Sequence, residues 1–141
     1  MKQNGTVFEY EKERNKDLMR AFHQCLRTHC GMPFIKMCEH ISHAPASRFW
    51  VSEERATIVV SQMLEGKHPV LKPQKTEMYN EIYRRVQALR AVYPDRSISD
   101  LVFDVVHQPA PSFYYTPSSV REIIYRIKRE WFEKRQQRQH P

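Results

Sequence analysis

Apolar residues recur every three or four positions along most of the chain, which is the spacing of helices with one buried face. The first such stretch predicts a helix from about Glu11 to Thr28. A second, shorter helix is expected between Pro33 and Pro45, and a third from Ser52, whose hydroxyl can accept from the exposed amides of a first turn. The apolar residues expected on these helices are Leu18, Met19, Phe22, Cys25, Leu26, Phe34, Met37, Cys38, Ile41, Ala56, Val59, Val60 and Met63.

The second half of the chain repeats this order with clearer boundary signals. Thr76 is placed to cap a long helix, and Ser97 with Asp100 matches a capping box before another apolar run. Thr116 followed by Pro117 predicts the start of the last helix, because proline at the first helical position loses no intrahelical hydrogen bond. The expected inward residues are Met78, Ile82, Val86, Leu89, Ile98, Leu101, Val102, Val105, Val120, Ile123, Ile124, Ile127 and Trp131.

The two halves align without a gap at an offset of 64 residues. The stretch HAPASRFWVSEERATIVV at residues 43–60 matches HQPAPSFYYTPSSVREII at residues 107–124. The boundaries of the expected elements coincide as well, since each half contains helix, link, helix, proline-containing turn and helix. A duplicated supersecondary unit is the economical interpretation. The identities in this window pair His43 with His107, Pro45 with Pro109, Ala46 with Ala110 and Phe49 with Phe113.

We therefore predict an all-α fold of two tandem three-helix units packed together. Short extended segments at SRFWV and SFYYT are an alternative for the long turns. The linker is placed at GKHPVLKPQK, because glycine and two prolines fall close together there. The predicted boundaries are a flexible N-terminal arm at residues 1–10, a first repeat at 11–65, a linker at 66–75, a second repeat at 76–135 and a frayed tail at 136–141.

Charge then narrows the class of partner. The chain of 141 residues has a formal net charge of +7, and its pI is near 9.5. Residues 71–141 contribute +5 of this charge and residues 1–70 contribute +2. A basic surface favours an anionic partner such as nucleic acid.

Several classes are disfavoured by what the sequence lacks. No run approaches the roughly 18 apolar residues that span a bilayer, and the first residues lack the apolar core of a secretory signal, so we expect a cytoplasmic protein with no membrane partner. Three cysteines without a secretion signal predict reduced thiols. With three glycines in the chain, no glycine-rich phosphate loop is present, and no motif implies a cofactor. Asp104 and His107 lie one helical turn apart without an adjacent nucleophile, so an enzyme is not expected.

The segment ISDLVFDVVHQPAPSFYYTPSSVREIIYRIKR resembles the helix-turn-helix family of DNA-binding domains. It has a positioning helix, a turn and a last helix that begins with a Thr cap. It departs from the family in its turn of about nine residues, where a compact helix-turn-helix has about three or four. The resemblance implies that the start of the last helix enters the major groove while flanking basic residues contact phosphates.

Carried onto this chain, the resemblance singles out residues of the last helix. Arg121 and Arg126 are the best base-reading candidates, because a guanidinium can bind guanine through two hydrogen bonds. The groove-facing candidates are Ser118, Ser119, Arg121, Glu122, Tyr125 and Arg126. The phosphate-contacting candidates are Lys128, Arg129, Lys134, Arg135 and Arg138.

In the first repeat, the corresponding helix start carries Glu53 and Glu54, which would repel phosphates. Arg48 and Arg55 are the basic candidates there. We therefore expect the second repeat to be the main DNA-binding unit. The first repeat would dock on the second repeat, on a partner protein or on a symmetry mate.

Two further patterns have competing interpretations. The segment HQCLRTHCGMPFIKMCEHISH is rich in zinc-ligand residue types, but Cys25 and Cys38 fall on the apolar stripes, which predicts small buried side chains instead of ligands. Phe49 and Phe113 are expected to fix the long turns to the core.

The sequence thus favours a DNA-binding protein of regulatory or accessory role, with RNA left open as the ligand. The alternative is a protein-interaction or assembly module, including a homo-oligomer, without a nucleic-acid role. In that case exposed aromatic residues would form the interface. The candidates for it are Trp50, Tyr114, Tyr115, Trp131 and Phe132.

Overall fold

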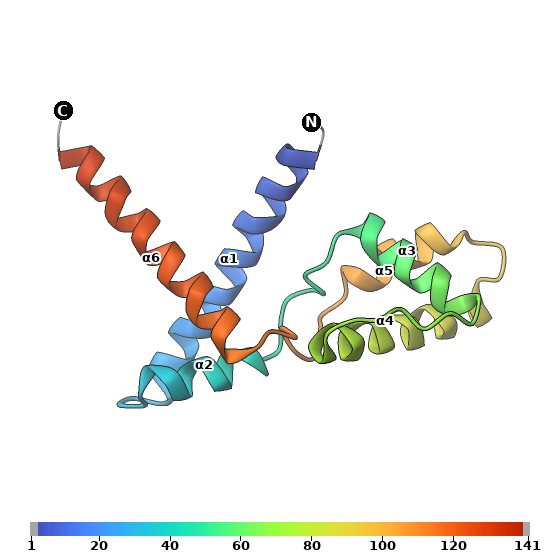
Figure 1. The fold of residues 1–141 in the computed structure, drawn as a ribbon, viewed down its shortest axis with the longest axis horizontal. Coiled ribbons are helices and arrows are strands. Elements are labelled where there is room, and N and C mark those ends of the chain that lie inside the picture. Colours follow the sequence, from blue (N-terminus) through green and yellow to red (C-terminus); the bar gives the residue numbers. More distant parts are fainter. Residues whose placement is uncertain (1–2, 140–141) are drawn as a thin grey trace. The chain divides into compact units, whose positions relative to one another are not determined.

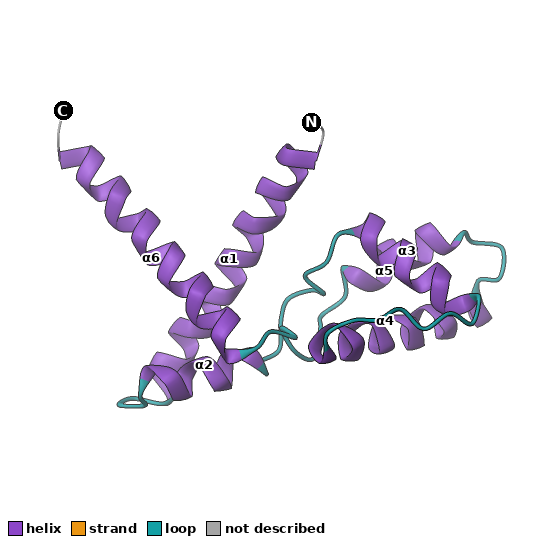
Figure 2. Ribbon diagram, viewed as in Figure 1, coloured by secondary structure: helices purple, strands orange, loops and turns teal. Residues whose placement is uncertain are grey.

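The computed structural model describes residues 3–139, and the side chains of residues 10–138. Over residues 3–139 the chain forms six helices and no strand, which confirms the all-α class (Figures 1 and 2). The helices are α1 (Gln3–Thr28), α2 (Phe34–Ser42), α3 (Glu53–Leu64), α4 (Pro73–Val92), α5 (Ile98–Val106) and α6 (Pro117–Gln139).

Two predicted helix starts, those at Ser52 and Ser97, are confirmed by cap hydrogen bonds. The Ser52 hydroxyl accepts from the Arg55 amide at 3.1 Å, and the Ser97 hydroxyl accepts from the Asp100 amide at 3.1 Å. Each bond satisfies one backbone N–H that the first turn leaves without an intrahelical partner. These starts could be predicted because the partner lies three residues away in the sequence.

Other boundaries differ from the prediction. Helix α1 begins at Gln3 instead of near Glu11, so residues 3–10 of the expected arm are helical. The prediction started from the apolar stripe that begins at Leu18, whereas α1 begins earlier in the sequence. Helix α4 begins at Pro73, and the Thr76 hydroxyl donates to the Lys72 carbonyl at 3.2 Å instead of capping the helix. Helix α6 includes residues 136–139 of the expected tail. Residues 1–2 of the arm and 140–141 of the tail lie outside the described residues.

The helices divide into two compact units, but these are not consecutive halves of the chain. The first unit contains α1, α2 and α6, and the second is the continuous stretch Pro45–Tyr114 with α3, α4 and α5. Within each unit all three helices contact one another. The expected tandem units are therefore not confirmed, because the third helix of each predicted repeat packs on the first two helices of the other.

The α1–α2–α6 unit has a core at the place where its three helices meet. Leu18 of α1, Ile41 of α2, and Val120 and Ile124 of α6 have at most 1% of their surface exposed. From this core α1 and α6 diverge toward the two ends of the chain (Figure 1).

The α3–α4–α5 unit is built in the same way around apolar residues with no exposed surface. Val59 and Val60 of α3, Ile82 of α4, and Leu101 and Val105 of α5 form this core. The two links that lead into and out of the unit pair at one point. The Ala46 amide donates to the Ala110 carbonyl and the Ala110 amide to the Ala46 carbonyl, both at 3.0 Å. This bridge is the extent of extended pairing among the described residues.

In this exchange, α3 packs on α4 and α5 while α6 packs on α1 and α2, and the apolar pattern of the sequence does not specify that choice. The inward residues of α3 and α6 correspond at the 64-residue offset, with Val59 matching Ile123 and Val60 matching Ile124. Both helices therefore present similar apolar stripes, and burial alone discriminates weakly between the two pairs of helices that could receive them. Local patterns predict which residues are buried, but they do not specify which helix covers them.

Candidate nucleic-acid interface

The start of α6 is fixed by contacts on both sides of its first residue. The Thr116 hydroxyl accepts from the Ser119 amide at 3.1 Å, which confirms the predicted cap, and it lies 3.0 Å from the Ser119 hydroxyl. Just before the cap, Arg14 of α1 donates to the Tyr115 hydroxyl at 3.4 Å. Burial raises the pKa of Tyr115, and the charge of Arg14 opposes part of that shift. The start of α6 is therefore held within the α1–α2–α6 unit, and the Ser119 hydroxyl is already hydrogen-bonded to the Thr116 hydroxyl.

Several polar and basic residues of α6 are exposed to solvent. Ser118, Arg121, Arg126 and Arg129 are all exposed. Among the residues with described side chains, none of the three arginines forms an ion pair with a carboxylate. Over its 23 residues α6 has seven basic and three acidic side chains, which makes it a strongly positive element of the chain.

Arg121 and Tyr125 lie on the side of α6 that meets α2. The Tyr125 ring is 5.3 Å from the Phe34 ring, and half of Tyr125 is exposed. The Arg121 guanidinium is 6.0 Å from the Tyr125 ring. Burial raises the pKa of the Cys38 thiol on α2, and the nearby charge of Arg121 partly lowers it. Arg121 is therefore oriented by its neighbours, while Arg126 and Arg129 have no such contact among the described residues.

Lys128 is placed differently from the phosphate-contacting role expected for it. Its Nζ atom lies 4.8 Å from the centroid of the Phe22 ring and 5.8 Å from that of Phe34. An ammonium group over an aromatic face is attracted by the ring quadrupole. This contact links α6 to α1 and α2, while Lys128 itself remains exposed.

Arg48 also makes its contacts inside the molecule. Its Nε donates to the Phe49 carbonyl at 3.0 Å and its Nη2 donates to the Val51 carbonyl at 2.8 Å. The guanidinium lies 5.0 Å from the Trp50 ring, and 12% of the side chain is exposed. These contacts hold the link before α3, so we omit Arg48 from the interface.

The start of α3 is an acidic cluster in the α3–α4–α5 unit. Glu53 lies 2.8 Å from the His107 Nε2 atom and 3.7 Å from the Arg48 Nη2 atom. Burial acts to raise the pKa of Glu53, but hydrogen bonds to its own amide and to His107, with the charge of Arg48, lower it overall. Nearby, burial raises the pKa of Tyr79, and Arg55 opposes part of that shift through its charge and a hydrogen bond. Arg55 is exposed and follows Glu53 and Glu54 in the first turn of α3.

The cysteine- and histidine-rich segment does not form a ligand cluster in the described part of the chain. Cys25 and Cys38 are buried, as their place on the apolar stripes predicted, whereas Cys30 is exposed. The His29 and His40 rings are 4.5 Å apart. No three His, Cys, Asp or Glu side chains converge there as a metal site would require.

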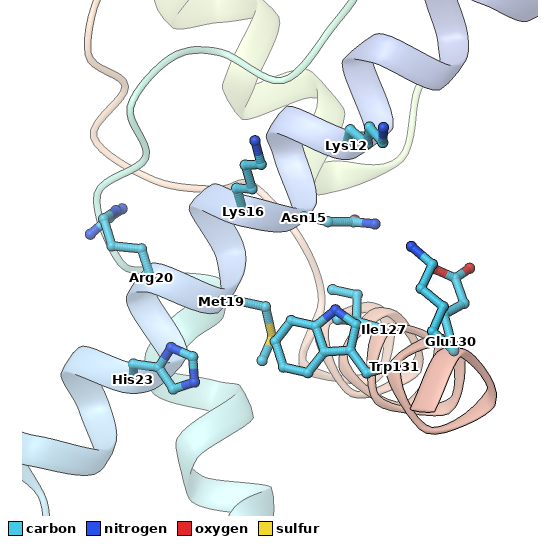
Figure 3. Close-up of a pocket in the computed structure, with 10 residues that line it drawn as sticks. Lys12, Asn15, Lys16, Met19, Arg20, His23, Ile127, Glu130 and Trp131 are labelled. Atoms are coloured by element: carbon cyan, nitrogen blue, oxygen red, sulfur yellow. The ribbon is translucent and has the colours of Figure 1, made fainter. Parts of the chain in front are cut away.

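The sequence did not indicate one further feature of this unit, a groove between α1 and α6 (Figure 3). Lys12 and Lys16 of α1 line it together with Trp131 of α6. The apolar stripe predicted Trp131 as an inward residue, yet 49% of its surface is exposed. The groove forms because α6 packs on α1, and local sequence patterns do not specify that these two helices are in contact.

Comparisons with family models, curated proteins and solved structures find no match for this chain. Among the helices of the described residues, none combines the length and apolar character needed to span a membrane.

Proposed function

We propose that this chain is a DNA-binding protein of regulatory or accessory role, with α6 as its reading helix. The observation that carries the proposal is the set of exposed arginines on α6 that have no acidic partner among the described side chains. Arg121 and Arg126 would contact base edges, and Arg129 would contact a phosphate. Ser118, exposed in the first turn, is a further groove contact.

The packing of α6 supports a modified version of the helix-turn-helix resemblance. In that family a positioning helix packs against the helix that enters the groove. Helix α5 precedes α6 in sequence but belongs to the other unit, and α2 contacts α6 instead. We therefore assign the positioning role to α2. The acidic start of α3 makes the α3–α4–α5 unit the weaker candidate for contact with a polyanion.

Binding of a randomised duplex DNA pool at several salt concentrations tests this function. We expect affinity to fall steeply with salt, because each neutralised phosphate releases counterions. Arg129→Ala should reduce the slope of log affinity against log salt by about one, as loss of one phosphate contact predicts. Arg90→Ala is the matched control, because Arg90 is exposed on α4, outside the proposed interface.

Base reading is tested separately by selection from the same pool. The double variant Arg121→Ala, Arg126→Ala should lose enrichment of any preferred sequence, because each good guanidinium–guanine pair contributes about 1–3 kcal/mol of discrimination. A shallow salt slope, or enrichment unchanged in the double variant, would contradict DNA reading by α6.

A protein-interaction module is the second candidate, and one observation favours it. Trp131 and Phe132 are 49% and 61% exposed on the outer turns of α6. Large aromatic residues are enriched at protein interfaces. Under this alternative, duplex affinity is weak and nearly independent of the arginines, whereas Trp131→Ala and Phe132→Ala abolish capture of a protein partner.

A further inference from the structure

The groove between α1 and α6 has an apolar floor. Its volume is about 460 Å³, and Met19 of α1 with Ile127 and Trp131 of α6 line it (Figure 3). Met19 and Ile127 are buried, whereas Trp131 keeps 49% of its surface exposed. Trp131 follows Ile127 at the next i+4 position, so it extends the buried stripe of α6 by one turn. The floor is thus a continuation of the core that remains open to solvent.

The rim of the groove is positively charged. Lys12 and Lys16 lie on α1 and Lys134 lies on α6, and all three are exposed. None of them forms an ion pair within the part of the chain whose side chains are described. Glu130 is the acidic residue among those that line the groove. The lining therefore combines an aliphatic and aromatic floor with a rim of excess positive charge.

The helices around the groove extend beyond their packed core. All residues of α6 from Lys128 to Arg138 are exposed. Short helices that do not pack are marginally stable in water, because most helical stability in proteins comes from burial of one face. Helices α1 and α6 diverge along this stretch (Figure 1).

We propose that this groove binds an acidic amphipathic helix of a protein partner. The apolar face of that helix packs on Met19, Ile127 and Trp131, as in other complexes where a helix occupies a hydrophobic groove. Acidic residues on its flanks pair with Lys12, Lys16 and Lys134. Charge complementarity selects this occupant over a second copy, because an identical groove would bring the same lysines face to face.

The same lining argues against nucleic acid in the groove. Met19 and Ile127 form an aliphatic floor that suits the apolar face of a helix better than a charged sugar–phosphate backbone. Arg129, the proposed phosphate contact, is two positions from Ile127 and Trp131, about 200° around α6 from the groove floor. The groove proposal therefore does not rest on the proposed DNA-binding function.

The probe is a synthetic helical peptide with Leu at i, i+3, i+4 and i+7 positions and Glu at the others, added to the full chain. The chain has two tryptophans, and Trp50 is 5% exposed, so a change in emission reports mainly on Trp131. We expect saturable binding with a blue shift in emission, and the shift should disappear in Trp131→Phe. The same peptide with Lys in place of Glu should bind at least roughly tenfold more weakly.

Charge reversal on the protein provides the matched test. The variant Lys12→Glu, Lys16→Glu should weaken binding of the Glu peptide roughly tenfold, measured by the Trp131 titration. The control is Lys67→Glu, Lys72→Glu, which makes the same charge change at exposed positions outside the groove. Circular dichroism verifies that both variants fold.

The proposal is overturned by absence of binding at millimolar peptide, by equal affinity for the Glu and Lys peptides, or by equal weakening in the two double variants. Displacement of the bound peptide by a single-stranded oligonucleotide would also overturn it, in favour of nucleic acid in the groove. Arg129→Ala should leave peptide affinity unchanged, so failure of this proposal and failure of DNA binding are distinguishable.

Discussion

Phe49 shows how a single aromatic residue fixes a long link. It has no exposed surface, and its amide donates to the Val106 carbonyl at 3.0 Å. The Arg85 guanidinium lies 4.9 Å from its ring, and the Tyr114 ring is stacked at 6.2 Å. Phe113, its counterpart in the second repeat, is 3% exposed. These burials confirm that the phenylalanines attach the links to the cores.

Replacing Phe49 with Ala should destabilise the α3–α4–α5 unit by about 3–5 kcal/mol, because a buried aromatic ring is removed and a cavity is left. Phe132→Ala is the matched control, since that ring is 61% exposed, and its cost should stay within about 0.5 kcal/mol. Urea unfolding followed by circular dichroism measures both. Similar midpoints for the two variants would contradict the role given to Phe49.

Glu81 gives a residue-scale prediction for acid stability. Hydrogen bonds from Arg84 and Arg85 outweigh burial and lower the pKa of Glu81 to about 2. A lowered pKa in the folded state stabilises the protein above the ordinary carboxyl pKa, and this contribution is lost as pH falls from about 4.5 toward 2. Arg84 is 68% exposed, so solvent reduces the effect to about 1 kcal/mol.

Glu81→Gln should therefore lower stability at neutral pH by about 1 kcal/mol and have little effect near pH 2. Glu77→Gln, an exposed change on the same helix, should leave the pH profile unaltered. Urea unfolding at a series of pH values checks both variants. A constant difference between Glu81→Gln and the parent at every pH would refute the assigned cause.

Among the elements, α5 depends on its cap because it is only nine residues long. Ser97→Ala removes the hydroxyl that accepts from the Asp100 amide, and we expect a loss of about 1 kcal/mol. Ser99→Ala deletes the same hydroxyl inside the helix at an exposed position, so it should not be destabilising. Thermal unfolding of the two variants is the comparison. Equal shifts would mean that the Ser97 hydroxyl does not act as a cap.

The elements also show where sequence patterns suffice and where they do not. The starts of α3, α5 and α6 were predictable because each cap involves residues three apart. The start of α4 was misplaced because Pro73 needs no cap hydroxyl. In the proposed interface, the exposure of Arg126 and Arg129 was predictable because both residues lie outside the apolar stripe of α6. The contacts of Lys128 were not predictable, because they involve Phe22 of α1 and Phe34 of α2. The packing of α6 on α1 and α2 was not predictable either, because it depends on tertiary contacts.

At the scale of the whole molecule, the packing of the helices can be compared with the 64-residue offset of the sequence. The helix sets α1, α2, α6 and α4, α5, α3 correspond in order under the 64-residue offset, and each forms one compact unit. The bridge between the links pairs Ala46 with Ala110, which are counterparts at the same offset. Reciprocal pairing of a residue with its own counterpart is what a local two-fold relation between the links produces. Duplication of a unit that exchanged its third helix with a second copy would explain both observations.

This arrangement predicts which fragments of the chain fold. The fragment 45–114 contains all of the α3–α4–α5 core and the partners that hold its links, so it should unfold cooperatively on its own. The fragment 1–65 is a complete repeat by sequence, but the partners of Phe49 at Arg85, Val106 and Tyr114 are missing from it, as is α6. We expect it to lack fixed tertiary packing. Near-ultraviolet circular dichroism and amide dispersion in NMR spectra distinguish the two. A folded, monomeric 1–65 would show that α3 can pack on α1 and α2, and that the exchange is not needed for folding.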